Sequence, residues 1–102
     1  PVLGISMLNV TDTSALYRNN ISVSSNIKSG VVVVSITENS GASKSNLKAG
    51  DIITEMNGEK VDNIAYLRYE LYKYTPNETI EVTYIRDNKQ YKTKVTLSKS
   101  NN

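Results

Sequence analysis

The sequence contains neither histidine nor cysteine among its 102 residues. The lack of histidine excludes the usual general base, the Ser-His-Asp triad and imidazole ligands for a metal ion. The lack of cysteine excludes thiol nucleophiles, zinc–thiolate sites and disulfides. Carboxylate pairs such as Asp51 and Glu55 exist, but nothing marks them as a catalytic pair, since most carboxylates are solvated surface groups. We therefore expect no enzymatic activity in this chain itself, no metal and no cofactor.

Strong charge and long apolar runs are also missing. Twelve Lys and Arg against ten Asp and Glu leave a net charge of +2, too small and too mixed to indicate a nucleic-acid surface. No apolar run approaches the roughly 18 residues that a membrane-spanning helix needs, so we expect no direct membrane insertion. The length and the 38% hydrophobic share suit one domain with one modest core. Because the chain begins inside a structured-looking segment, we interpret it as a piece of a longer protein.

Strand signals recur along most of the chain. The β-branched run VVVVSIT indicates a strand that is covered on both faces. Asn57-Gly58 favours a type I′ hairpin turn, and Asp87-Asn88 separates two alternating segments. The predicted strands cover residues 3–10, 31–37, 51–56, 59–61, 79–86 and 90–97.

Three helices are predicted between these strands. The longest spans residues 62–74, is capped by Asp62 or Asn63, and carries an apolar stripe formed by Ile64, Leu67, Leu71 and Tyr74. A short helix at about 14–19 is capped by Asp12 or Thr13, and another at 42–47 ends at Asn46 or Gly50. The rest of residues 11–30 is polar and is interpreted as a surface excursion.

This order of elements predicts the fold class. It describes a small α+β domain, a partly open barrel or sandwich of five to six short strands with two to three helices. The domain is expected to cover residues 1–99, and residues 100–102 are expected to form a frayed polar tail. An edge strand beside a helix in such a fold leaves a groove with unpaired backbone groups.

Three segments resemble a known family over about residues 1–99: PVLGISM, GVVVVSITENSGASKSNLKAGDIITEMNGEKV and YLRYELYKYTPNETIEVTYIRDNKQY. Together they resemble a bacterial PDZ domain of the HtrA/Deg serine-protease type. The resemblance implies the circularly permuted bacterial form of the PDZ fold, and residue usage is similar to that of low-GC Gram-positive bacteria. Gly41, Asn46 and Asn88 depart from the commoner family pattern, although Asn accepts the positive φ that a glycine would supply at the last two positions.

The resemblance also implies a binding site at the start of the chain. Val2-Leu3-Gly4-Ile5 looks like the family's carboxylate-binding loop, with backbone N–H groups of Leu3, Gly4 and Ile5 as donors to a terminal carboxylate. Successive N–H groups can form such an anion-binding concavity, which a side chain at Gly4 would obstruct. The alternative is that Gly4 only bends a strand.

A peptide would then add as a strand beside residues 5–10, against the helix at 63–73. The resemblance implies that Ser6, Met7, Ile64, Arg68 and Leu71 surround this groove. Stripe position alone does not separate a pocket wall from plain core. Arg68 either pairs with an acidic peptide or covers the pocket with its stem, or it is an ordinary solvated charge.

The predicted function is a non-catalytic, peptide-binding PDZ module of an HtrA-type serine endopeptidase. It would capture C-termini of substrate or misfolded proteins and regulate the protease domain of its own chain, in a parent that is membrane-anchored, extracytoplasmic and trimeric through the protease domain. The alternatives are a PDZ domain of a C-terminal processing or intramembrane protease, or an assembly module whose groove is filled by a neighbour. The sequence leaves open whether the polar residues 19–29 cover the groove.

Overall fold

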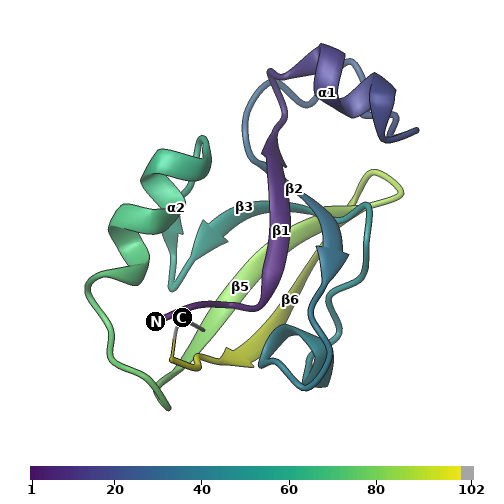
Figure 1. Ribbon diagram of the computed structural model, residues 1–102. Coiled ribbons are helices and arrows are strands. Elements are labelled where there is room, and N and C mark those ends of the chain that lie inside the picture. The colour runs from purple at the N-terminus through teal and green to yellow at the C-terminus, as the bar shows by residue number, and fades with distance from the viewer. Residues whose placement is uncertain (100–102) are drawn as a thin grey trace.

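An antiparallel sheet with two helices beside it forms the domain (Figure 1). The computed structural model describes residues 1–99, so the tail expected at residues 100–102 lies outside the described residues. The strands follow the order β1-β2-β3-β5-β6, and β4 pairs with β3. The predicted α+β fold is confirmed. The elements are β1 (Ile5–Asn9), α1 (Thr13–Arg18), β2 (Val31–Ile36), the 3-10 turn η1 (Ala42–Lys44), β3 (Ile52–Met56), β4 (Glu59–Lys60), α2 (Ile64–Leu71), β5 (Thr79–Arg86) and β6 (Lys89–Thr96).

Asparagine-containing dipeptides close both hairpins, as predicted. Asn57 and Gly58 have φ values of 50° and 81°, and Asp87 and Asn88 have values of 53° and 63°. Two consecutive residues with positive φ define the turn whose twist matches that of antiparallel strands. Asn tolerates this conformation better than most side chains do, so the local sequence alone determines these turns.

The strand β2 is covered on both faces, as its sequence predicted. Val31 and Val33 belong to the main core, whereas Val32 belongs to a second cluster on the other face of the sheet. That second cluster also contains Leu16 of α1, and Ile21, Val23 and Ile27 pack against it. The interpretation of residues 11–30 as a plain surface excursion is therefore wrong, because this segment supplies the cover for one face of the sheet.

The predicted helix at 42–47 is wrong beyond its first turn. Only the three residues of η1 are helical, and Ser45 is already extended. The amide of Asn46 donates to the hydroxyl of Thr93 at 3.2 Å, and Leu47 is buried in the core. Asn46 does not adopt positive φ, unlike Asn88, so the expected glycine-like role holds only for Asn88. Tertiary contacts with β6 override the short local helix signal.

The helix α2 is shorter than predicted, and its N-cap is the second of the two candidates, one residue after Asp62. The side chain of Asn63 accepts a hydrogen bond from the amide of Tyr66 at 3.0 Å, so Asn63 is the N-cap. Leu67 and Leu71 are buried in the main core, while Tyr74 lies past the helix end and its hydroxyl accepts from Asn57 at 2.8 Å. Neither helix of the described part of the chain is long and apolar enough to cross a membrane.

Asp51 is held in a structural ion pair. Its carboxylate accepts two hydrogen bonds from Arg86, both of 2.7 Å, and one of 2.7 Å from the amide of Lys48. The hydrogen bond to Asp51 raises the pKa of the Arg86 guanidinium above its ordinary value. The bidentate geometry and the buried carboxylate indicate a role in stability, consistent with the view that Asp51 does not form a catalytic pair with Glu55.

Candidate functional site

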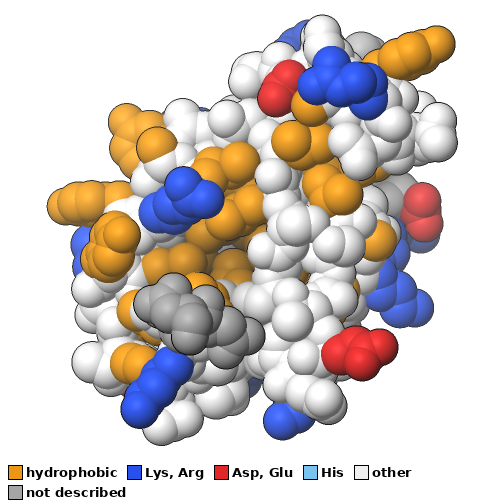
Figure 2. Space-filling view, viewed as in Figure 1, with side chains coloured by type: hydrophobic (Ala, Val, Ile, Leu, Met, Phe, Trp, Pro, Cys, Tyr) orange, Lys and Arg blue, Asp and Glu red, His pale blue; other side chains and the backbone are white. Residues whose placement is uncertain are grey.

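A groove of about 540 Å³ lies between β1 and α2. Figure 2 shows hydrophobic side chains gathered in this hollow, with a basic side chain over its upper part. The groove combines apolar side chains with polar groups from the loop after β2. Its lining consists of Pro1, Val2, Leu3, Gly4, Ile5, Met7, Thr37, Glu38, Asn39, Ser40, Leu67, Arg68, Leu71, Tyr72 and Ser98.

Within residues 1–99, the strand β1 lies at the edge of the sheet and pairs only with β2. Thr37 donates its amide to the carbonyl of Gly4 at 2.8 Å, and Val10 donates to Gly30 at 3.1 Å, so even-numbered residues of this segment face β2. Hydrogen bonding alternates along an antiparallel strand, which leaves the backbone groups of Ile5 and Met7 directed away from β2, towards the groove. The edge is therefore free to accept another strand.

The loop before β1 is fixed through its carbonyl groups. The carbonyl of Val2 accepts from the amide of Ser98 at 3.1 Å, that of Leu3 from Ala42 at 3.0 Å, and that of Gly4 from Thr37. Within residues 1–99, the amides of Leu3 and Gly4 have no acceptor. Together with the outward amide of Ile5, these donors are the three that the sequence analysis selected. Their free N–H groups lie on a rigidly held backbone, which suits an anion.

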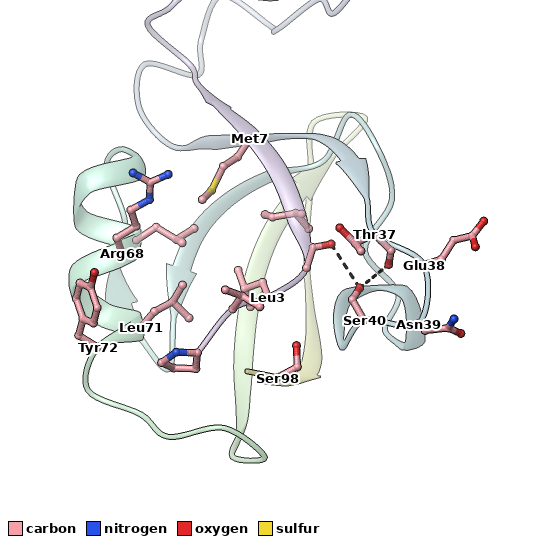
Figure 3. A pocket seen from close by; sticks show the side chains of 15 residues that line it. Leu3, Met7, Thr37, Glu38, Asn39, Ser40, Arg68, Leu71, Tyr72 and Ser98 are labelled. Carbon is pink, nitrogen blue, oxygen red and sulfur yellow. Dashed lines mark hydrogen bonds between the residues drawn. The ribbon is translucent and has the colours of Figure 1, made fainter. Parts of the chain in front are cut away.

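Gly4 is required for a reason that the sequence did not reveal. Its φ is +91°, and a Cβ atom built at this position would overlap the Cβ and Oγ atoms of Ser40. The group that approaches Gly4 is thus a side chain of the same domain. Ser40 Oγ also donates to the carbonyl of Thr37 at 2.7 Å, shown as a dashed line in Figure 3, and accepts the amide of Ser43 at 3.1 Å. These contacts hold the loop after β2 against the loop before β1.

The floor of the groove is part of the core. Leu3 and Leu71, which lie close together in Figure 3, are 2% and 7% exposed and belong to the main cluster. Met7 and Ile5 are half-buried and pack against the same cluster. The sequence left open whether these residues form core or pocket wall. In the structure they belong to the core cluster and also line the groove.

Two residues expected at the groove do not line it. The hydroxyl of Ser6 forms a 2.6 Å hydrogen bond with that of Ser35, so it belongs to the opposite side of β1. Ile64 is half-buried against the main core at the start of α2. Residues 19–29 are not part of the lining either, and α1 and the following loop lie at the far end of β1 (Figure 1). They leave the groove uncovered.

Asn9 closes the groove at one end, a role that sequence reasoning missed. Its side-chain carbonyl accepts the amide of Ile64 at 2.7 Å, and its backbone carbonyl accepts the amide of Asp12 at 3.0 Å. The free edge of β1 is therefore limited to Ile5 and Met7. The sequence had placed the accessible edge over residues 5–10, which is too long.

Among the described residues, two charged side chains line the groove, and Figure 3 shows them on opposite sides of it. Arg68 projects from α2 near Met7, and Glu38 lies in the loop after β2. No group of three or more acidic residues in the described part of the chain is arranged to hold a metal ion. The site can thus offer backbone donors, a strand edge and an apolar floor, which is the chemistry of binding rather than of bond cleavage.

Comparison with known proteins agrees with this description. The family profile of the PDZ domain matches residues 1–97, and the chain belongs to the PDZ domain family. The predicted resemblance to HtrA proteins is also confirmed by sequence relatives. The chain is 37% identical over 100 residues to the serine protease Do-like HtrA of Lactococcus lactis subsp. lactis, covering 98% of this chain and 24% of that protein. It is 32% identical over 97 residues to the protein of the same name in Lactobacillus helveticus, with 95% and 24% covered.

Solved structures share the fold. An HtrA-type protease AlgW with a decapeptide superposes with a TM-score of 0.77 at 14% identity, covering 95% of this chain and 28% of that one. The HtrA3 PDZ domain bound to a phage-derived ligand, FGRWV, gives 0.70 at 23% identity, with 93% and 82% covered. The chain spans about a quarter of the length of the curated relatives described above, and it corresponds to their non-catalytic PDZ region.

Proposed function

We propose that this domain captures the carboxyl-terminal ends of other polypeptides in the groove between β1 and α2. The observation that carries the proposal is the loop at Leu3, Gly4 and Ile5. The carbonyls of Val2, Leu3 and Gly4 accept hydrogen bonds within the domain. The N–H groups of Leu3, Gly4 and Ile5 stay free beside an open strand edge. A terminal carboxylate matches these donors, because it is the one anionic group that every polypeptide carries at the end of its main chain.

The remaining contacts follow from the strand edge. A peptide would lie antiparallel to β1 and pair with the outward backbone groups of Ile5 and Met7. Its last side chain would rest on the apolar floor near Leu3 and Leu71. Because Asn9 closes the far end, only about four peptide residues pair with the domain. Such a small contact implies micromolar affinity, roughly −6 to −8 kcal/mol.

The relatives support a wider proposal for the parent protein. The relatives described above are named as serine proteases, and both structures described above contain a peptide ligand. In the proposed parent, an HtrA-type endopeptidase, the domain binds exposed ends of substrate or misfolded proteins and regulates the protease domain of its own chain. A related protein from Haemophilus influenzae, 40% identical over 68 residues, is named a probable periplasmic serine protease. We propose a parent outside the cytoplasmic membrane, anchored to it, and trimeric through the protease domain.

Backbone NMR titration tests the core of this proposal. Peptides ending in apolar residues are added to the ¹⁵N-labelled domain, alongside the same peptides with an amidated C-terminus. The expected result is that shifts cluster at Leu3 to Met7 and along α2, and that amidation abolishes them. Equal binding of both forms would contradict the carboxylate loop. If neither form binds, the groove does not capture chain ends, and an assembly role for this surface takes precedence.

A further inference from the structure

The two methionines of the chain differ sharply in their access to solvent. Met7 lies on β1 and is half-buried, and Figure 3 shows its thioether sulfur in the groove between β1 and α2. Met56, at the end of β3, is fully buried in the main core. A small dissolved molecule therefore reaches the sulfur of Met7 from the groove, whereas it reaches that of Met56 only when the core opens.

The composition leaves these two side chains as the only sulfur groups of the chain. The sequence has two methionines, and it has neither cysteine nor tryptophan. A thioether reacts with a peroxide by taking one oxygen atom and becomes a sulfoxide. The O–O bond of the peroxide breaks, an S–O bond forms, and the second oxygen of hydrogen peroxide leaves as water. The sulfur is oxidised by two electrons, the peroxide is reduced, and no other group of the domain is required.

Oxidation at Met7 would change the chemistry of the groove. Met7 packs against the main core cluster and lines the groove together with Leu3 and Ile5. The sulfoxide turns this flexible apolar side chain into a polar one that holds water on its oxygen. A peptide that enters the groove must then displace this water, and it gains less apolar contact in return.

We propose that Met7 is an oxidation site for peroxides, and that its sulfoxide weakens the binding of peptides in the groove about tenfold in Kd. The inference rests on the proposed capture of chain ends in the same groove. Methionine sulfoxide reductases reverse the change, because a dithiol takes up the oxygen as water and becomes a disulfide. The dithiol has no other target in this domain, since the chain contains no cysteine.

Mass spectrometry after treatment with hydrogen peroxide tests the site itself. Trypsin cleaves after Arg18, Lys48 and Lys60, so the two methionines fall on separate peptides. Met7 is expected to gain one oxygen at least about tenfold faster than Met56, because oxidation of Met56 waits for the core to open. A bound peptide that ends in an apolar residue and lacks methionine should slow oxidation of Met7. Equal rates at the two methionines would overturn the assignment.

Fluorescence anisotropy with the same labelled peptide tests the effect on binding. The Kd is measured before peroxide, after peroxide, and after both classes of methionine sulfoxide reductase have acted with dithiothreitol. In the unaltered domain we expect a loss of about tenfold that the reductases restore, with an unchanged circular dichroism spectrum. Met56→Leu conserves core volume and leaves Met7 as the remaining methionine, so it should show the same loss and recovery.

Met7→Leu provides the matched control, because it replaces the thioether with an apolar side chain of similar size. Its affinity is compared only with itself, and the ratio of its Kd values after and before peroxide should be close to one. A loss that persists in this variant reports damage elsewhere and contradicts the role of Met7. If the variant binds no peptide, the reversible loss in Met56→Leu decides, since only Met7 can be reduced there.

The outcomes separate the two proposals. If the untreated domain binds the peptide and oxidation of Met7 leaves the Kd unchanged, capture of chain ends stands and the inference about Met7 is wrong. If peroxide removes the circular dichroism signal together with binding, the loss reports unfolding and the inference is likewise wrong. If the untreated domain binds no peptide, both proposals fail.

Discussion

The side chain of Asn9 accepts a 2.7 Å hydrogen bond from the amide of Ile64, and so joins the end of β1 to the first residue of α2. The amide of a helix's first residue has no partner inside the helix, and here a neighbouring strand supplies one. The two walls of the groove are thereby fixed to each other at one end. The separation of the walls depends on this contact as well as on the apolar floor.

Replacing Asn9 with alanine is expected to lower the free energy of unfolding by about 1 kcal/mol, because the Ile64 amide loses its acceptor. Urea denaturation followed by circular dichroism measures this loss. Asn9→Asp retains an acceptor oxygen and serves as the control, with a smaller loss expected. Equal stability of Asn9→Ala and the unaltered domain would show that water replaces the side chain without cost.

Gly4→Ala is expected to destabilise the domain by about 3 kcal/mol. Positive φ costs a non-glycine residue about 1 kcal/mol, and the overlap with Ser40 adds the cost of overpacking. Gly58→Ala isolates the first contribution, since Gly58 has φ +81° but open space around its Cβ direction. Its expected loss is about 1 kcal/mol. The double variant Gly4→Ala with Ser40→Gly removes the overlap and should recover part of the loss; no recovery would mean that Ser40 is not the obstacle.

Arg86→Met is expected to cost about 3 kcal/mol in unfolding free energy, because it leaves the Asp51 carboxylate buried with only the Lys48 amide as partner. Lys92→Met breaks an exposed ion pair with Glu81, whose atoms lie 3.9 Å apart, and should cost about 0.5 kcal/mol or less. Thermal and urea unfolding of both variants measures the contrast. Similar losses in the two variants would refute the distinction between buried and exposed pairs.

Hydrogen exchange provides a test of the free strand edge. The amides of Ile5 and Met7 face away from β2 and should exchange fast although they lie in a strand, whereas those of Ser6 and Leu8 should exchange slowly. NMR-detected exchange in deuterium oxide resolves the alternation. Addition of a binding peptide should slow exchange at Ile5 and Met7. Uniform protection along β1 without any ligand would show that another group already covers this edge.

The parts of the fold that depend on local chemistry were predictable. Asn57-Gly58 and Asp87-Asn88 are residues that tolerate the positive φ of their turns, and the β-branched run from Val31 identifies a strand buried on both faces. The family motif at the start of the chain pointed to the loop at Gly4, whose role as a carboxylate site stays a prediction. Each of these signals occupies only a few consecutive residues, so no knowledge of distant contacts is needed to interpret it.

The parts that depend on distant contacts were missed. Ser40 packs on Gly4 across 36 positions of sequence, and Asn9 reaches Ile64 across 55. Ile21 and Ile27 lie in a polar stretch without periodicity, so nothing local indicates that they cover a sheet face. The lost helix near Asn46 has the same cause, since a hydroxyl of β6 competes for its amide.

The pairing of Val2 with Ser98 has a mechanical consequence. Two backbone hydrogen bonds, 2.9 and 3.1 Å long, join Val2 and Ser98, in the first and last parts of the described chain. A pulling force applied between Val2 and Ser98 would act on this pair first. Its two hydrogen bonds would break one after the other, whereas a long strand under shear would lose many hydrogen bonds at once. Leu3 and Gly4 follow immediately, so tension would distort the loop with the free amides before it reached the sheet. A peptide bound at this loop would thus dissociate under tension while the sheet remained folded.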